Sequence, residues 1–168
     1  MTQKVETLIA TMAAGIEDLI RKDELTDPVM IGIHTGGAWV AQSLHRRLGL
    51  EEPLGTLDIT FYRDDFTHIG LNPQIRPSDL PFDVEGRDII LVDDILHTGR
   101  TIRAAMNEIF DYGRPARIKL GVLVERSRGR ELPIRADVAG ERLDLGPHEY
   151  IKLSGPDPLD LHVQQTAT

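Results

Sequence analysis

The chain has 168 residues, a formal net charge of −8 and no cysteine. The lack of thiols excludes disulfides, thiolate zinc sites, iron–sulfur clusters and cysteine nucleophiles, and the negative charge excludes nucleic-acid binding through the overall electrostatic field. The length fits one domain, residues 1–168. The sequence shows no signal peptide and no 18-residue apolar window, so we expect a cytoplasmic protein that does not span a membrane.

Helical periodicity and short apolar runs alternate along the chain, and together they predict eight elements. In chain order these are helix 3–22, strand 29–33, helix 38–49, strand 54–62, strand 87–92, helix 101–113, strand 116–125 and strand 149–155, after which a polar tail is expected. Strands that alternate with helices predict an α/β fold in which helices flank a mostly parallel sheet.

Periodicity fails between the fourth and fifth of these elements, in residues 63–86, where prolines and glycines gather. A stretch of this length without secondary structure is usually a functional loop or a disordered one. We therefore predict a flexible loop over about residues 63–86, with Arg63 at its start.

Two junctions follow predicted strands, and in open parallel sheets ligands bind at the carboxyl ends of strands. The first junction reads IHTGG, residues 33–37, and the second reads DDILHTGRT, residues 93–101. Both are therefore candidate ligand-binding segments.

The second junction combines two kinds of site. Asp93 and Asp94 are adjacent carboxylates at the end of a buried strand; their mutual repulsion requires a cation, hydroxyl donors or water nearby. Thr98, Gly99 and the two residues after them open a helix, where free N–H groups and the helix dipole favour an anion. Carboxylates for sugar hydroxyls beside an anion nest suit a ribose 5-phosphate.

Either half alone is more simply interpreted as a solvated turn or an ordinary helix cap, and it is their combination after an apolar strand that favours a site. The chain has no G-x-x-x-x-G-K-[ST] and no G-x-G-x-x-G motif, so the main signals for nucleoside-triphosphate hydrolysis and dinucleotide binding are missing. The six histidines show no metal-ligand spacing.

The stretch IILVDDILHTGRT, residues 89–101, resembles the phosphoribosyl-pyrophosphate (PRPP) motif of type I phosphoribosyltransferases. With LDITFYRDD (57–65), GRPARIKLGVLVER (113–126) and RELPIRADVAG (130–140), the chain more narrowly resembles the PyrR family, pyrimidine operon attenuation regulators that are also uracil phosphoribosyltransferases. The resemblance implies the type I α/β fold, with a small hood beside the sheet and a flexible loop.

The resemblance also implies a reaction, in which uracil and PRPP give UMP and pyrophosphate, and a role for each motif. Asp93 and Asp94 would hold the ribose hydroxyls and act in catalysis with Arg63, which would grip pyrophosphate. The ribose and 5-phosphate would be bound by the twin acids and by Leu96, His97, Thr98, Gly99, Arg100 and Thr101. The pyrophosphate loop would be Thr35, Gly36 and Gly37, and the base would be read by Ile134, Arg135 and Asp137. Mg²⁺ would be held through PRPP and water, with no direct protein ligand.

The sequence departs from the family pattern in the first loop, where typical members read roughly KTRG and this chain has His34 and Gly36 in place of the two cations. The loss should weaken the grip on pyrophosphate without abolishing activity, since each charged hydrogen bond contributes ~1.5–3 kcal/mol.

The second departure concerns RNA as a partner. Residues 1–30 hold three Lys/Arg against six Asp/Glu, which makes the first helix a poor phosphate partner. Arg126, Arg128 and Arg130 could supply a basic patch, and a solvated surface is the simpler interpretation. RNA binding is therefore a weaker expectation than catalysis.

Two functions from different classes remain open. The first is a uracil phosphoribosyltransferase, with regulation of pyrimidine genes as an added role, and the second is a UMP- or PRPP-sensing regulator that binds RNA or another partner with weak or no catalysis. The family forms dimers and larger assemblies, so a homo-oligomer is expected.

Overall fold

The structure of the chain is a computed structural model, and it describes residues 2–59 and 78–166. Its elements are, in chain order, α1 (Thr2–Lys22), β1 (Val29–Ile33), α2 (Gly36–Leu48), β2 (Gly55–Leu57), β3 (Asp88–Leu96), α3 (Arg100–Tyr112), β4 (Arg117–Arg126), β5 (Val138–Leu143), β6 (Glu149–Ser154) and β7 (Asp160–Gln165). Within these residues no helix is both long and apolar enough to cross a bilayer.

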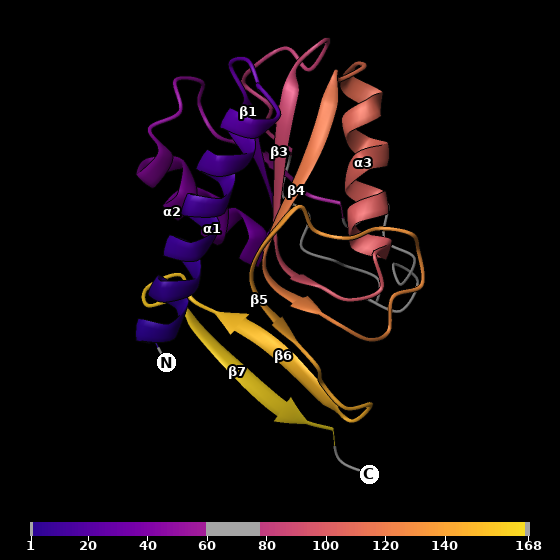
Figure 1. Cartoon of the computed structure of the whole chain (residues 1–168). Helices are drawn as coiled ribbons and strands as arrows, with labels where there is room; N and C mark the ends of the chain where they lie inside the picture. The colour runs from indigo at the N-terminus through magenta and orange to yellow at the C-terminus, as the bar shows by residue number, and fades with distance from the viewer. Residues whose placement is uncertain (1, 60–77, 167–168) are drawn as a thin grey trace.

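Five strands form one parallel sheet in the order β2-β1-β3-β4-β5. Helices α1 and α2 cover one face and α3 covers the other, as Figure 1 shows. Because successive side chains of a strand point to opposite faces, the apolar runs of β1 and β3 supply both cores: Ile90 packs with α1 and α2, and Ile89 packs with α3. The predicted α/β fold with a central parallel sheet is confirmed.

Most predicted elements are present within two residues of their expected ends, but the predicted strand 87–92 is too short. Strand β3 continues through Asp93 and Asp94 to Leu96, where it pairs with Glu125 of β4. Because aspartates are depleted in strands, the sequence did not predict this extension. The acids therefore lie within the ladder rather than after it.

Two strands were not predicted, and one was predicted too long. Strand β5 joins the sheet edge, and β7 forms where a polar tail was expected. Strand β7 reads DLHVQQ and pairs with β6 alone among the described strands; with only two apolar residues, Leu161 and Val163, it resembles a polar tail in the sequence. Of the predicted strand 54–62, β2 takes up only Gly55–Leu57 in the part of it that is described.

The β6–β7 hairpin lies beyond the carboxyl ends of the sheet strands, at the lower end of Figure 1. It is anchored by Leu153 and Leu161, directly opposite each other in the hairpin and buried in the core beneath α1 and α2. This small second sheet corresponds to the hood that the resemblance implies.

The predicted flexible loop 63–86 falls only partly among the described residues. Arg63 and the rest of 63–77 lie outside them. Residues 78–86 contain no strand or helix, yet Asp79 bridges to Thr56 of β2 and Val84 is buried. These last nine residues of the predicted loop are therefore packed against the sheet.

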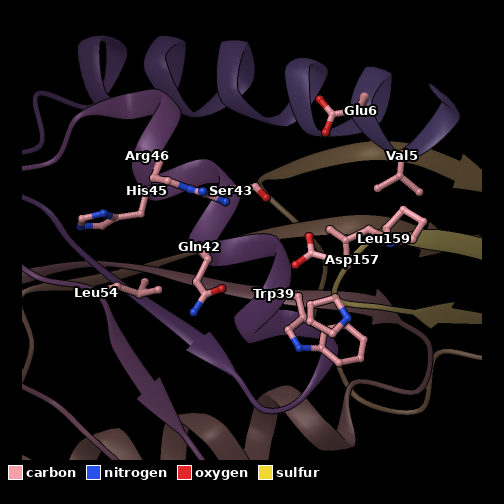
Figure 2. Close-up of a pocket in the computed structure, with 12 residues that line it drawn as sticks. Val5, Glu6, Trp39, Gln42, Ser43, His45, Arg46, Leu54, Asp157 and Leu159 are labelled. Atoms are coloured by element: carbon pink, nitrogen blue, oxygen red, sulfur yellow. The ribbon is translucent and has the colours of Figure 1, made fainter. Parts of the chain in front are cut away.

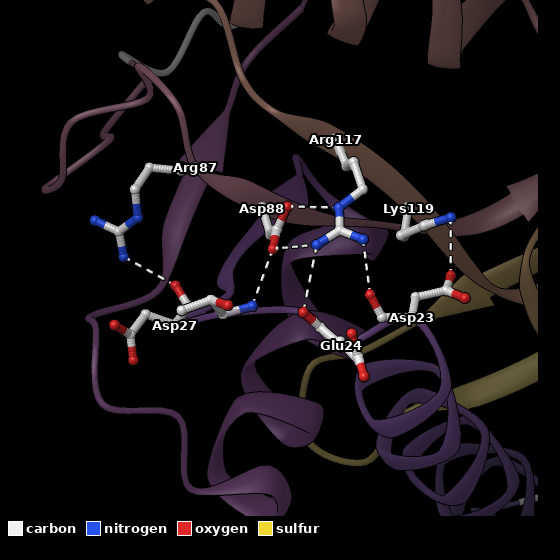
Figure 3. Close-up of polar contacts among 8 residues, drawn as sticks. Asp23, Glu24, Asp27, Arg87, Asp88, Arg117 and Lys119 are labelled. Carbon is white, nitrogen blue, oxygen red and sulfur yellow. Dashed lines mark hydrogen bonds and ion pairs between the residues drawn. The ribbon is translucent and has the colours of Figure 1, made fainter.

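The amino ends of β3 and β4 are joined by an ion pair between the buried Asp88 and the exposed Arg117 (Figure 3). Asp88 is 5% exposed and accepts hydrogen bonds from Arg117 at 2.9 and 2.8 Å and from the Thr26 N–H at 3.0 Å. The same guanidinium donates to the carbonyls of Asp23 and Glu24. This cluster fixes the turn between α1 and β1 at the end of the sheet opposite the carboxyl ends.

Two flanking contacts extend this cluster, as Figure 3 shows. Lys119 pairs with the Asp23 carboxylate at 3.0 Å, and Arg87 donates to the Asp27 carbonyl at 3.0 Å. All the contacts lie on the turn before β1 or at the starts of β3 and β4, so the cluster stabilises the sheet rather than a binding site.

Candidate functional site

The strand order creates a topological switch point between β1 and β3. From β1 the chain moves to β2 on one side, whereas β3, β4 and β5 lie on the other. Residues Gly32 and Val92 pair near the carboxyl ends of the two strands. In open α/β sheets, ligands bind in the crevice outside such a switch point, and both predicted junctions, 33–37 and 93–101, open into it.

The twin aspartates lie at this crevice. Asp93 is 5% exposed and Asp94 is half-buried. Asp93 Oδ1 accepts the Asp94 N–H at 2.8 Å, and Asp94 Oδ1 accepts the Ile95 N–H at 2.8 Å. These bonds orient both carboxylates, and because an ionised carboxylate has about four lone-pair sites, acceptor capacity is left for ligand hydroxyls.

The first loop lies directly against these carboxylates. A Cβ atom on Gly36 would lie 2.2 Å from Asp94 Oδ2, and one on Gly37 would lie 2.8 Å from the Val92 carbonyl oxygen and 2.9 Å from Asp93 Oδ1. Only glycine permits this approach, so the structure brings the predicted pyrophosphate loop and the predicted ribose site together. Thr35 occupies the N-cap position of α2 at the same place, without a capping hydrogen bond from its side chain.

The predicted phosphate loop leads from β3 into α3. Gly99 has a positive φ of 94° and precedes the first helical residue, which turns the chain so that free N–H groups of the helix face the loop. The Thr98 hydroxyl accepts the Arg100 N–H at 3.1 Å. A depression of about 180 Å³ is lined by Ile95, Leu96, His97, Thr98, Gly99, Thr101 and Ile102.

Two 13-residue helices, α2 and α3, thus begin at the crevice, on either side of the twin aspartates. Each N-terminus carries a partial positive charge, equivalent to about half an elementary charge. The crevice therefore offers two anion-favouring positions around a pair of carboxylates, which suits a sugar with phosphate groups at two positions.

The side chain of Arg100 does not point into the depression as a free cation. Its Nε donates to Glu131 Oε1 at 2.9 Å in an exposed ion pair. The phosphate loop at this position offers its backbone and hydroxyls, while Arg100 links α3 to Glu131, just before the residues predicted to read the base.

The predicted base-reading stretch lies beside the phosphate loop. A Cβ on Gly99 would lie 3.4 Å from Ile134 Cβ, so Ile134 borders the loop. Arg135 is exposed. Asp137 instead accepts the Leu120 N–H at 2.8 Å, near the start of β4, and its carboxylate extends the β4–β5 ladder. The structure brings Ile134 to the site and gives Asp137 a structural contact.

The ring of His97 lies behind the phosphate loop, near two cations. Arg126 Nη1 lies 3.4 Å from His97 Nδ1, and Arg130 donates to the His97 carbonyl oxygen. The pKa of His97 is below its usual value, chiefly because burial penalises the charged ring and then because Arg126 and Arg130 repel it. The lowered pKa disfavours the charged form of His97, which is exposed and lines the depression beside the phosphate loop.

A larger cavity, about 780 Å³, lies away from the crevice (Figure 2). It is bordered by Trp39 and Arg46 of α2, by Glu6 of α1 and by the β6–β7 turn around Asp157. None of its lining residues belongs to the predicted site. Trp39 packs, partly buried, against the core under α1 and α2.

The described residues contain no group of three or more His, Asp or Glu that could hold a metal ion. The twin carboxylates provide oxygen atoms, the ligand type that Mg²⁺ prefers, but too few for an all-protein site. This donor set fits an ion that keeps several waters and takes its other ligands from a phosphorylated substrate.

Comparison with known proteins agrees with this geometry. The family model for the phosphoribosyl transferase domain matches residues 2–148. The bifunctional protein PyrR of Nitrosococcus oceani is 57% identical over 162 residues, which cover 95% of this chain and 91% of that protein. The bifunctional protein PyrR of Pseudomonas entomophila is 55% identical, over 95% of this chain and 92% of that protein.

Among solved structures, hypoxanthine phosphoribosyltransferase from Trypanosoma cruzi superposes with a TM-score of 0.67. The match covers 90% of this chain and 81% of that one, at 24% sequence identity. At this identity the likeness shows the fold alone, and it agrees with the parallel sheet of Figure 1.

Proposed function

The chain belongs to the phosphoribosyltransferase family as a PyrR-type member, and on that premise we propose that it transfers the phosphoribosyl group of PRPP to uracil, giving UMP and pyrophosphate. The observation that carries this proposal is the position of Asp93 and Asp94. They lie at the switch point, between two helix N-termini and against the glycines of the first loop.

Each part of the crevice takes one part of the substrate. Asp93 and Asp94 accept hydrogen bonds from the ribose hydroxyls, the N-terminus of α3 holds the 5-phosphate, and the N-terminus of α2 holds pyrophosphate. Pyrophosphate is already a good leaving group, so the protein needs little nucleophilic chemistry and acts by positioning. The twin carboxylates also stabilise the positive charge that develops on the ribose ring.

Mg²⁺ fits this arrangement as an ion that arrives with PRPP. Its oxygen ligands would come mainly from pyrophosphate, the ribose hydroxyls and water, with Asp93 and Asp94 beside them, and it would neutralise the leaving group. Arg63 remains a candidate for gripping pyrophosphate.

The direct test is an assay of UMP formation from uracil and PRPP with magnesium. Hypoxanthine and orotate serve as control bases. We expect turnover with uracil and little with either control. Turnover with a control base but not with uracil would overturn the substrate assignment while leaving the phosphoribosyltransferase chemistry in place.

A second function is suggested by the word "bifunctional" in the names of the relatives, and we propose that it is regulation of pyrimidine genes. A regulator without catalysis is not favoured, because relatives 55–57% identical to this chain are named bifunctional. Retardation of a pyrimidine leader RNA at physiological salt tests whether RNA is the partner. A shift in RNA mobility that responds to UMP would support this role. The absence of any shift at every protein concentration tested would contradict it.

The close contact between the first loop and Asp94 gives a further prediction. Replacing Gly36 with alanine should displace the Asp94 carboxylate, because the new Cβ would overlap Asp94 Oδ2. We expect kcat/KM for PRPP to fall about tenfold, which corresponds to the loss of one charged hydrogen bond.

A matched control exists for this variant. A Cβ on Gly146 would lie 3.8 Å from Glu149 Oε2, an ordinary van der Waals distance, and this glycine lies in a turn away from the crevice. Gly146→Ala should leave kcat/KM unchanged. If Gly36→Ala behaved like Gly146→Ala, the contact between Gly36 and Asp94 would not matter for PRPP use.

A further inference from the structure

We propose that Glu125 and Arg130 are positioning residues that hold the phosphate loop and the base-reading stretch in a fixed register, so that the two halves of a nucleotide are bound cooperatively. The inference rests on the proposed function, because it assigns the two halves of UMP to these two segments. It concerns residues that touch neither half directly.

Glu125 lies at the carboxyl end of β4, beside the residue that begins the phosphate loop. It pairs with Leu96 in the β3–β4 ladder and is 5% exposed. Its two carboxylate oxygens accept Arg130 Nη2 at 3.0 Å and Arg142 Nε at 2.9 Å, and Oε1 also lies 3.4 Å from the Ala136 N–H. A buried carboxylate with this set of donors is a junction between segments.

Arg130 carries the connection from Glu125 to the phosphate loop. Its guanidinium donates to the His97 carbonyl oxygen and lies 3.3 Å from the Arg126 carbonyl oxygen. Its side chain is only 22% exposed. Arg130 therefore fixes the backbone at the first residue after β3, while Glu125 fixes Arg130 from the other side.

Backbone contacts complete the connection between the two segments. The N–H groups of Glu131 and Leu132 donate to the Thr98 carbonyl oxygen at 2.9 and 3.1 Å. Gly129, at φ 88°, passes so close to the His97 ring that a Cβ there would lie 2.5 Å from Nε2. The segment that starts at Gly129 is thus held to the phosphate loop along its length.

This arrangement also revises the basic patch considered for RNA. Of Arg126, Arg128 and Arg130, the first is 8% exposed and the last points inward to Glu125 and His97. Arg128 is exposed and pairs with Asp144 at 2.7 Å. Arg126 and Arg130 therefore make internal contacts beside the phosphate loop and do not form a phosphate-binding surface.

Cooperativity follows from this rigid connection. UMP contacts both segments, whereas ribose 5-phosphate contacts the twin acids and the phosphate loop but not the base-reading stretch. If the two segments are held in a fixed relative position, binding of the ribose phosphate of UMP also places its base at the second segment. No further ordering of the protein is then needed. If the contacts between the two segments are removed, UMP should lose this gain in affinity, whereas ribose 5-phosphate should keep most of its affinity.

The experiment measures the dissociation constants of UMP and of ribose 5-phosphate by calorimetry for the full chain and four variants. Arg130→Met removes the connection, Arg130→Lys keeps the charge and one donor, and Glu125→Gln keeps the shape but removes the charge. Arg128→Met is the matched control, two positions away and exposed. A general loss of folding would weaken both ligands and would not change the ratio of their affinities.

We expect the preference for UMP over ribose 5-phosphate to fall about tenfold in Arg130→Met, to recover partly in Arg130→Lys and to be unchanged in Arg128→Met. Should Arg130→Met fail to fold, Glu125→Gln is expected to show the same fall. An unchanged ratio in the folded Arg130 and Glu125 variants, or an equal fall in Arg128→Met, would overturn the inference. Failure of the unmodified chain to bind UMP would instead overturn the proposed function.

Discussion

Replacing Asp94 with asparagine is expected to lower kcat/KM for UMP formation about 100-fold. The carboxylate faces the crevice and keeps acceptor capacity after its bond to the Ile95 N–H. Each charged hydrogen bond to a ribose hydroxyl contributes ~1.5–3 kcal/mol, and the same charge stabilises the cationic ribose ring of the transition state. An amide keeps the shape of the side chain and a neutral acceptor oxygen, but it removes the charge on which both contributions depend.

The same substitution at Asp93 should be at least as harmful to activity. Asp93 is the more buried of the two acids, and it also accepts the Asp94 N–H at 2.8 Å. Asp93→Asn therefore disturbs the orientation of its neighbour as well as its own contact with ribose. Its loss of activity should include a weaker binding of UMP, which calorimetry measures without turnover.

A surface aspartate provides the control for both variants. Asp18 lies on α1 and its side chain is 49% exposed, in ion pairs with Arg21 and Lys22. Asp18→Asn makes the same change in charge far from the switch point, and it should leave kcat/KM and UMP affinity unchanged. If Asp93→Asn and Asp94→Asn bound PRPP and UMP as well as Asp18→Asn does, the crevice would not be the nucleotide site.

The sequence predicted the parts of the fold that depend on strong local patterns. Helix α1 has seven apolar residues at helical spacing, and β1 is a continuous apolar run, so both were predicted nearly to their ends. Strand β3 was predicted too short, because its last residues include two aspartates whose place in the ladder depends on pairing with β4. Strand β7 was missed because its residues are mostly polar and the alternation of Leu161 and Val163 with them is too short to predict a strand.

In the candidate site, too, the residues that lie close together in the sequence could be predicted, whereas contacts between distant residues could not. The motif DDILHTGRT is local, so its acids and phosphate loop could be found without a structure. The contact of Gly36 with Asp94 joins residues 58 positions apart, and that of Arg130 with His97 joins residues 33 positions apart. Such contacts follow from strand order and register, which a single sequence does not specify.

The ion pair at the opposite end of the sheet should control stability rather than activity. Replacing Asp88 with asparagine is expected to lower the free energy of unfolding by about 2 kcal/mol at pH 7, because two hydrogen bonds lose the charge of their acceptor. Urea denaturation measures this loss. Asp144→Asn, which breaks the exposed pair with Arg128, should leave the free energy of unfolding almost unchanged.

The dependence of this loss on pH distinguishes the ion pair from simple packing. Hydrogen bonds from Arg117 hold the pKa of Asp88 below its ordinary value of 3.8, against the opposing effect of burial. A pKa lowered by folding means that the carboxylate contributes its full stability above the unfolded-state pKa and loses it as the pH falls through the folded-state pKa. The difference between the unmodified chain and Asp88→Asn should therefore stay constant above about pH 5 and shrink below about pH 4. A difference that persisted unchanged into that acid range would show that the charge of Asp88 does not stabilise the fold.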